Sequence, residues 1–260
     1  PYENMGTIQT KGWELAIDYR HTFRNGLHFG VTASVADDKT EVTKWTHNTK
    51  IPTYGATGWW DKSAYKEGMV LGDIWGLQFD RFLTEDDFNA DGSLKAGLPD
   101  QTKVFPAGYQ FAPGDVLYKD LDNNGEIVKQ TNTNEKGDLS VIGNALPRLQ
   151  FGLNLDAAWK GFDISMFFQG VAKRKLWAAG NQVLPGFTTG EPFYKGAEDY
   201  WTPENTDAFY PRPMDYKQSA SGNYSVNDRY LLNMAYLRLK TFTVGYSLPK
   251  VWLSKFKVQR

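Results

Sequence analysis

The sequence of 260 residues contains no cysteine, which excludes disulfide bonds, thiolate metal ligands and cysteine nucleophiles. It has no run of about 18 apolar residues, so a transmembrane helix is excluded, whereas a transmembrane β-barrel, whose strands alternate, is not. It also lacks an excess of positive charge, with 29 Lys and Arg against 30 Asp and Glu. Neutralising nucleic-acid phosphates needs clustered basic charge, so we expect no nucleic-acid partner.

The two ends of the sequence lack the features of a complete secreted chain. Residue 1 is proline, and no basic segment followed by an apolar segment resembles a signal peptide. The last residues, 256–260, alternate like part of a strand. We therefore expect an internal fragment of a longer protein.

Aromatic residues are abundant, at 15% of the sequence, and many of them fall in segments that alternate with period two. Residues 13–19 place apolar and polar side chains on opposite faces, and Asn25-Gly26 predicts a hairpin turn before a second strand over 27–35. A second hairpin is predicted over 149–169, with its turn at Lys160-Gly161. A third begins at Tyr236, and its alternation changes phase near Thr241, which predicts a β-bulge.

The predicted strands are about 9 to 12 residues long, which is the length that crosses a bilayer, and aromatic residues lie near their ends (Tyr19, Phe23, Trp159 and Trp252). Short links alternate with two very long ones at 37–147 and 172–234. This pattern favours an all-β protein built as an antiparallel transmembrane β-barrel segment with long extracellular loops. A soluble secreted β-sandwich that binds glycans is the alternative, because alternation alone does not distinguish a lipid-facing surface from a packed core.

One loop has the pattern of a cation site. The run Asp120-Leu121-Asp122-Asn123-Asn124-Gly125 matches the first half of a calcium-binding loop, in which oxygens at alternate positions converge on one ion. The predicted ligands of Ca2+ or Mg2+ are the side chains of Asp120, Asp122, Asn124 and Asp138, with the carbonyl of Glu126. Thr131 stands where an EF-hand has glutamate, so a standard EF-hand is excluded, and a polar turn without an ion is the alternative.

Other candidate sites have less support. Trp59 and Trp60 are predicted to stack on a substrate such as a sugar ring, and anchoring of a loop is the alternative. Glu85 and Asp87 are the carboxylates that a glycoside hydrolase would use, but their surroundings are typical of a polar turn. The three histidines show no metal-ligand spacing, and no nucleophile or nucleotide-binding motif is present. We therefore predict no catalytic residue and no enzyme.

Several stretches form a recognisable set over nearly the whole chain, at residues 4–6, 11–14, 113–122, 141–147, 159–170, 200–205 and 236–249. Taken together and in this order, they resemble the C-terminal part of SusC/RagA-type TonB-linked outer-membrane proteins, the glycan and peptide importers of Bacteroidetes. The family usually has aspartate where Asn124 stands and a shorter gap to the later aspartate, which weakens a transferred ion site.

The resemblance implies that residues 1–260 form part of a barrel of about 22 strands in the bacterial outer membrane. It also implies active import of oligosaccharides or peptides with energy from TonB, and a SusD-like lipoprotein that closes the extracellular mouth. The plug domain that binds TonB is expected to be absent from this chain. Lumen-facing polar residues are predicted on the strands (Glu14, Asp18, Asn154, Asp156, Arg238 and Lys240).

Overall fold

The computed structural model describes residues 6–46, 67–129, 137–178, 180, 182–186, 194–214 and 222–249. The chain divides into two compact units. The strand unit comprises Thr10–Thr40, Pro147–Arg174 and Met234–Arg260, and the loop unit comprises Pro1–Gln9, Glu41–Leu146 and Lys175–Asn233. No described residue belongs to a helix that is long and apolar enough to cross a membrane.

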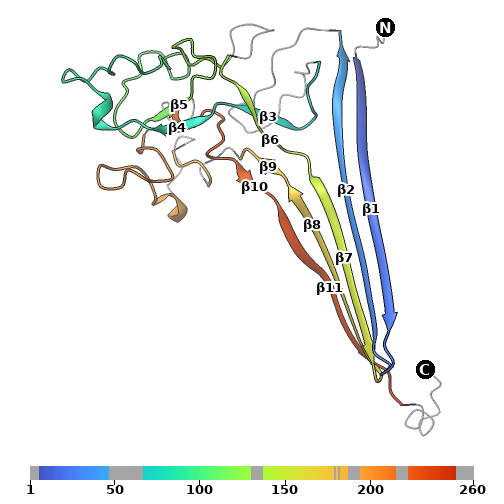
Figure 1. Cartoon of the computed structure of the whole chain (residues 1–260). Coiled ribbons are helices and arrows are strands. Elements are labelled where there is room, and N and C mark those ends of the chain that lie inside the picture. Colours follow the sequence, from blue (N-terminus) through green and yellow to red (C-terminus); the bar gives the residue numbers. More distant parts are fainter. Residues whose placement is uncertain are drawn as a thin grey trace. The chain divides into compact units, whose positions relative to one another are not determined.

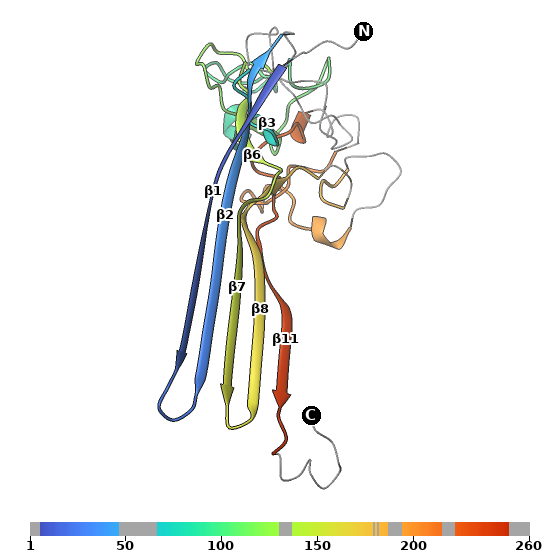
Figure 2. The same cartoon turned by 90° about the vertical axis from the view of Figure 1, so that its right-hand side faces the viewer.

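Five long strands form one sheet in the order β1-β2-β7-β8-β11, with β1 and β11 at its two edges (Figure 2). Their bounds are β1 (Gly6–Thr22), β2 (His28–Trp45), β7 (Arg148–Trp159), β8 (Phe162–Lys173) and β11 (Tyr236–Tyr246). The pairs β2–β7, β7–β8 and β8–β11 are antiparallel. The prediction of an all-β, antiparallel fold is confirmed.

The pairing register places the predicted apolar side chains on one face of the sheet and the polar ones on the other. Ala33, Leu153 and Phe168 lie opposite one another across β2, β7 and β8, and Leu239 of β11 continues this row. The neighbouring row on the other face contains Thr32 and Asn154. The period-two reading of the sequence therefore assigned the two faces correctly.

The turns and the irregularity of the sheet are also where the sequence predicted them. Gly26, Lys160 and Gly161 have φ values of 80°, 50° and 89°, as the tight hairpin turns require. The register between β8 and β11 shifts between Leu239 and Thr241, which confirms the β-bulge. Trp252, predicted to lie near a strand end, is outside the described residues.

β1 and β2 are longer than predicted, at 17 and 18 residues, so β2 continues into the stretch predicted as the first long loop. Apolar residues become rare after Val35, so the apolar alternation that predicts a strand is lost there. Thr40 and Val42 still alternate with the charged residues Lys39 and Glu41. β7, β8 and β11 have 12, 12 and 11 residues, within the predicted range.

Apart from the ends of β1 and β2, the described residues of the loop unit form short elements, and its short strands pair in twos (Figure 1). The strands are β3 (Asp73–Gly76), β4 (Phe79–Phe82), β5 (Val116–Tyr118), β6 (Ser140–Asn144), β9 (Lys175–Leu176) and β10 (Leu232–Asn233), with single-turn 3-10 helices η1 (Glu85–Asp87) and η2 (Lys195–Ala197). β3 pairs with β6, β4 with β5 and β9 with β10. β3 and β4 lie within the stretch predicted as the first long loop.

Two clusters of buried apolar residues occur in the described part of the chain, and both lie in the loop unit. One is centred on Leu77, Val116 and Tyr118, and the other on Ile74 and Trp177. Full burial of each such side chain contributes about 1.5–3 kcal/mol. The segments of the long predicted loops that belong to these clusters are therefore packed, not merely solvated connections.

Candidate functional site

The apolar face of the strand unit is exposed. Leu15 is 52% exposed, and Ile17, Phe242 and Val244 are exposed to a similar degree. Leu15, Phe151, Leu153 and Phe168 belong to neither buried cluster of the described chain. The two-layer core of the β-sandwich alternative is thus contradicted, because the side chains that would fill it cover one side of a single sheet.

Aromatic side chains gather at the hairpin-turn end of this sheet. Tyr19, Phe23 and Trp159, all predicted near strand ends, are exposed there. Phe162 and Tyr246 add a ring pair with centroids 4.4 Å apart. Aromatic residues in such a band are typical of a strand end at a membrane–water interface.

The opposite face of the strand unit carries a polar network. The hydroxyl of Thr32 donates to the Asp18 carboxylate at 2.7 Å, and Arg20 forms an ion pair with Asp18 at 3.3 Å. His28 lies 3.6 Å from the Asp156 carboxylate. Predicted lumen-facing residues Asp18 and Asp156 therefore lie among polar partners, as a water-facing surface requires.

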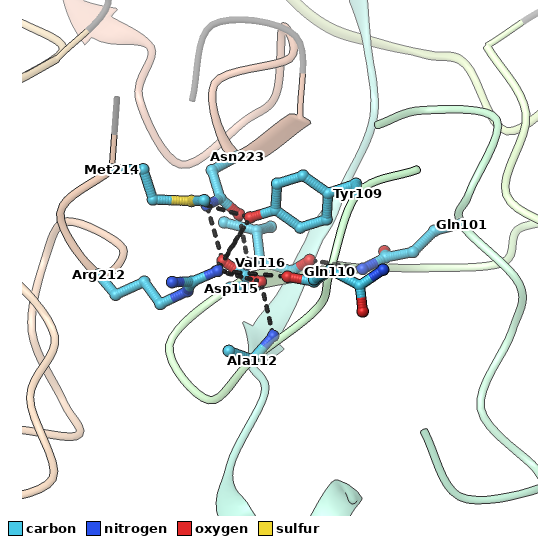
Figure 3. Close-up of polar contacts among 9 residues, drawn as sticks. All are labelled: Gln101, Tyr109, Gln110, Ala112, Asp115, Val116, Arg212, Met214 and Asn223. Carbon is cyan, nitrogen blue, oxygen red and sulfur yellow. Dashed lines mark hydrogen bonds and ion pairs between the residues drawn. The ribbon is translucent and has the colours of Figure 1, made fainter. Parts of the chain in front are cut away.

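The loop unit is organised around Asp115, a fully buried carboxylate in the sequence stretch 113–122 (Figure 3). The guanidinium of Arg212 donates to it at 2.8 and 3.2 Å. The hydroxyl of Tyr109 donates at 2.8 Å, the amide of Asn223 at 3.0 Å and the backbone N–H of Ala112 at 2.9 Å. The bonds from Arg212 and Asn223 join segments about 100 residues apart along the chain. Because all these bonds compensate the buried charge, Asp115 holds the segments together, and we call Asp115 with these partners the Asp115 clamp.

The neighbours of Asp115 have matched roles. Burial, followed by the charge of Asp115, raises the pKa of Tyr109, so its hydroxyl remains a hydrogen-bond donor. Gly114, at φ 91°, lies so close to Trp201 that an added Cβ would approach the indole ring to 2.5 Å. The backbone N–H of Arg212 donates to the carbonyl of Gly114 at 3.0 Å. Sequence reasoning missed this clamp because its partners are distant along the chain.

Three of the predicted cation ligands come together in the same unit. One carboxylate oxygen from each of Asp120, Asp122 and Asp138 lies within 4.8 Å of the others. Asp138 is fully buried and accepts the backbone N–H groups of Leu121 and Val128 at 2.8 and 2.7 Å, which fixes its carboxylate beside the turn. Carboxylate oxygens in such a cluster suit a hard cation such as Ca2+.

Backbone hydrogen bonds shape the turn that carries these ligands. Asp120 accepts the N–H of Gly125 at 2.8 Å. Desolvation alone would raise the pKa of the Asp120 carboxyl group. Hydrogen bonds from backbone N–H groups, mainly that of Gly125, outweigh this effect, so the pKa is lowered. The side-chain oxygen of Asn124 accepts the N–H of Glu126 at 2.7 Å, and the Glu126 carboxylate pairs with Lys103. The full five-residue ligand set stays a prediction.

The remaining predicted residues take other places. Trp59 and Trp60 lie outside the described residues. Asp87 forms a bidentate ion pair with Arg81 at 2.6 and 2.7 Å and accepts the backbone N–H of Thr84 at 2.8 Å. These bonds give the Asp87 carboxylate a structural role in η1. Arg81 accordingly holds the pKa of Asp87 at about 2.

Comparison with known proteins finds two curated receptors of similar sequence and solved structures of similar fold. TonB-dependent receptor P3 of Formosa agariphila is 25% identical over 266 residues, covering 99% of this chain and 23% of the receptor. TonB-dependent receptor P26 of the same organism is 25% identical over 264 residues, covering 95% of this chain and 23% of that receptor. The solved structure of the RagAB peptide transporter matches 97% of this chain and 24% of its own chain, with a TM-score of 0.63 and 15% identity. The resemblance to SusC/RagA-type TonB-linked proteins is confirmed.

The RagAB peptide importer in its "open-open" state matches the same share of the chain, with a TM-score of 0.59 and 16% identity. No family model matches the sequence. The chain thus has the fold of a SusC/RagA-type segment and spans about a quarter of the length of the proteins it matches. These relatives are named receptors, transporters or importers, which agrees with the prediction of a protein that is not an enzyme.

Proposed function

We propose that the chain is part of a TonB-dependent transporter in the bacterial outer membrane that imports oligosaccharides or peptides. The observation that supports this proposal best is the sheet with one exposed apolar face and one hydrogen-bonded polar face. An apolar face along the whole sheet must be shielded from water, and lipid hydrocarbon can do this. The band of aromatic residues at one end of the face fits the bilayer interface.

In this proposal the apolar face touches lipid hydrocarbon, and the polar face lines a water-filled lumen. The lumen-facing set is the one predicted from the sequence, namely Glu14, Asp18, Asn154, Asp156, Arg238 and Lys240. The edge strands β1 and β11 pair with further strands of a barrel of about 22, because an unpaired edge does not persist in a membrane.

The partners follow from the same proposal. A SusD-like lipoprotein covers the extracellular mouth. Its contacts, and those of the substrate, are the parts of the predicted loops 37–147 and 172–234 that lie outside the long strands β2 and β8. TonB acts through a plug domain supplied by residues outside this chain. The packed clusters of the loop unit support such a role, since a lid needs a defined surface to close on.

The test is uptake by cells that carry or lack the gene. Labelled oligosaccharides and peptides are supplied singly, and uptake is measured with and without a protonophore. We expect at least one ligand to enter only when the gene is present and the proton gradient is intact. Uptake that is the same in both strains for every ligand, or fractionation of the protein into the soluble phase, would refute the proposal.

We also propose that Asp120, Asp122 and Asp138 hold one Ca2+ ion that stabilises the loop unit. The convergence of three carboxylate oxygens supports this, because an ion would offset their mutual repulsion. Calcium at 100 times its Kd would stabilise the folded state by about 2.7 kcal/mol.

Calcium titration of the chelator-treated protein, followed by thermal unfolding, tests the ion site. Calcium should raise the Tm of the wild type and have much less effect on Asp122→Asn. Asp91→Asn is the matched control, because Asp91 is an exposed turn carboxylate that accepts only local bonds from Ser93. Equal calcium shifts in all three proteins, or none in the wild type, would show that the turn holds no ion.

A further inference from the structure

A pocket of about 380 Å³ opens in the loop unit, and its lining includes the chain neighbours of the clamp residues Arg212 and Asn223. Four tyrosines line it: Tyr194, Tyr200, Tyr210 and Tyr224. Tyr194 and Tyr200 are 43% and 40% exposed, whereas Tyr224 is 4% exposed. The volume lies within the range of ligand pockets, about 300–1,000 Å³.

The tyrosine wall is held firmly. Tyr200 and Tyr210 lie on paired segments, and the Tyr210 N–H donates to the carbonyl of Asp199 at 2.9 Å. The Asp199 carboxylate accepts the N–H of Phe209 at 3.0 Å. The Tyr210 ring stacks on Tyr230 at 6.0 Å with an interplanar angle of 12°. The wall is therefore preorganised, which lowers the entropic cost of binding.

The remaining lining gives the pocket its chemical character. Pro185, Pro211 and Pro213 add flat apolar surfaces and offer no backbone N–H, so a ligand strand does not pair with the chain there. Lys195 and Glu198 supply one cationic donor and one anionic acceptor. With the four tyrosine hydroxyls, the pocket presents more donor groups than purely accepting ones.

We propose that this pocket binds an extended, proline-containing peptide segment. Such a segment has the left-handed polyproline conformation, with carbonyls free of internal hydrogen bonds and with fewer N–H groups than other peptides. It therefore matches a pocket that is rich in donors, and its pyrrolidine rings pack on aromatic faces, as in other proline-recognition grooves. A sugar ring carries a donor on every hydroxyl, so it presents more donors to this wall than a proline-containing segment does and matches it less well.

Burial, followed by the charge of Asp199, raises the pKa of Tyr210 and keeps its hydroxyl a donor throughout the physiological pH range. The inference rests on the proposed import function and specifies its ligand class. It assigns peptide capture to the loop unit and leaves the route through the lumen unchanged.

Fluorescence anisotropy with the detergent-purified protein tests the inference. The probes are a labelled octapeptide of alternating proline and alanine, the same peptide with glycine at every proline, and labelled maltohexaose. We expect the proline peptide to bind most tightly, and Tyr200→Ala to raise its Kd at least tenfold, as loss of a central aromatic contact does. Tyr200→Phe, which keeps the ring, should raise it only a few-fold.

Tyr19→Ala is the matched control, because Tyr19 is an exposed tyrosine of the strand unit and should leave the Kd unchanged. Tighter binding of maltohexaose, no binding of any probe, or an equal Kd for wild type and Tyr200→Ala would overturn the inference. Cellular uptake separates this failure from failure of the transport proposal. Gene-dependent uptake that Tyr200→Ala leaves unchanged refutes the pocket alone, whereas peptide binding without any gene-dependent uptake refutes transport alone.

Discussion

Replacing Leu153 by lysine tests which face of the sheet meets lipid. Leu153 lies near the middle of β7, with Ala33 and Phe168 as its neighbours on the apolar face. If that face contacts hydrocarbon, a lysine here places an ammonium group close to the bilayer midplane. The expected cost is about 2–4 kcal/mol of folding free energy in a membrane.

The adjacent residue provides the matched control. Asn154 follows Leu153 in β7, so its side chain points to the opposite face, beside Thr32. Asn154→Lys introduces the same side chain on the face assigned to water and should cost less than about 0.5 kcal/mol. The contrast between neighbouring positions separates a lipid effect from a general intolerance of lysine in the strand.

Assembly in the outer membrane and resistance to urea extraction are the readouts. Leu153→Lys should lower both the assembled amount and the urea midpoint, and Asn154→Lys should leave both near wild type. Equal losses in the two variants would refute the assignment of faces, and a greater loss for Asn154→Lys would reverse it.

Three further substitutions test the packing. Asp115→Asn leaves the guanidinium of Arg212 without its counter-charge and should cost about 3 kcal/mol, seen as faster hydrogen exchange over 112–118; unchanged exchange would contradict the clamp. Asp87→Asn should cost about 1–2 kcal/mol near pH 7. Because Arg81 lowers the Asp87 pKa from 3.8 to about 2, this stabilisation is complete above pH 3.8 and is lost as pH falls through 2. The difference in Tm between wild type and Asp87→Asn should therefore shrink towards pH 2, and a constant difference would contradict it. Gly170→Ala introduces a Cβ 2.5 Å from the backbone carbonyl oxygen of Tyr236. We expect this clash to lower the free energy of unfolding by about 1–3 kcal/mol. An unchanged free energy of unfolding would show that the strands can separate locally.

The strand unit could be predicted from the sequence because its determinants are local. Period-two alternation identifies the faces, Asn25-Gly26 and Lys160-Gly161 identify the turns, and the change of phase near Thr241 identifies the bulge. The continuation of β2 to Trp45 was missed because charged residues replace the apolar ones on which the reading depended.

The loop unit could be predicted only in part, because its contacts join distant segments. The Asp120 turn has a local motif, and the structure brings Asp138 to it from beyond an insertion. The Asp115 clamp needs Arg212 and Asn223, and no periodicity or spacing connects these three residues. The tyrosine pocket was missed for the same reason, since its lining comes from several separated stretches.

Spin labelling of single cysteines along β7 measures the central claim most directly, and the absence of native cysteine from this chain makes it practical. Labels at residues 151, 153 and 155 should be accessible to molecular oxygen, which concentrates in lipid. Labels at 152, 154 and 156 should be accessible to a water-soluble nickel complex. This alternation is the predicted result, whereas labels at 151, 153 and 155 that neither reagent reaches would reveal a packed protein core and contradict the account.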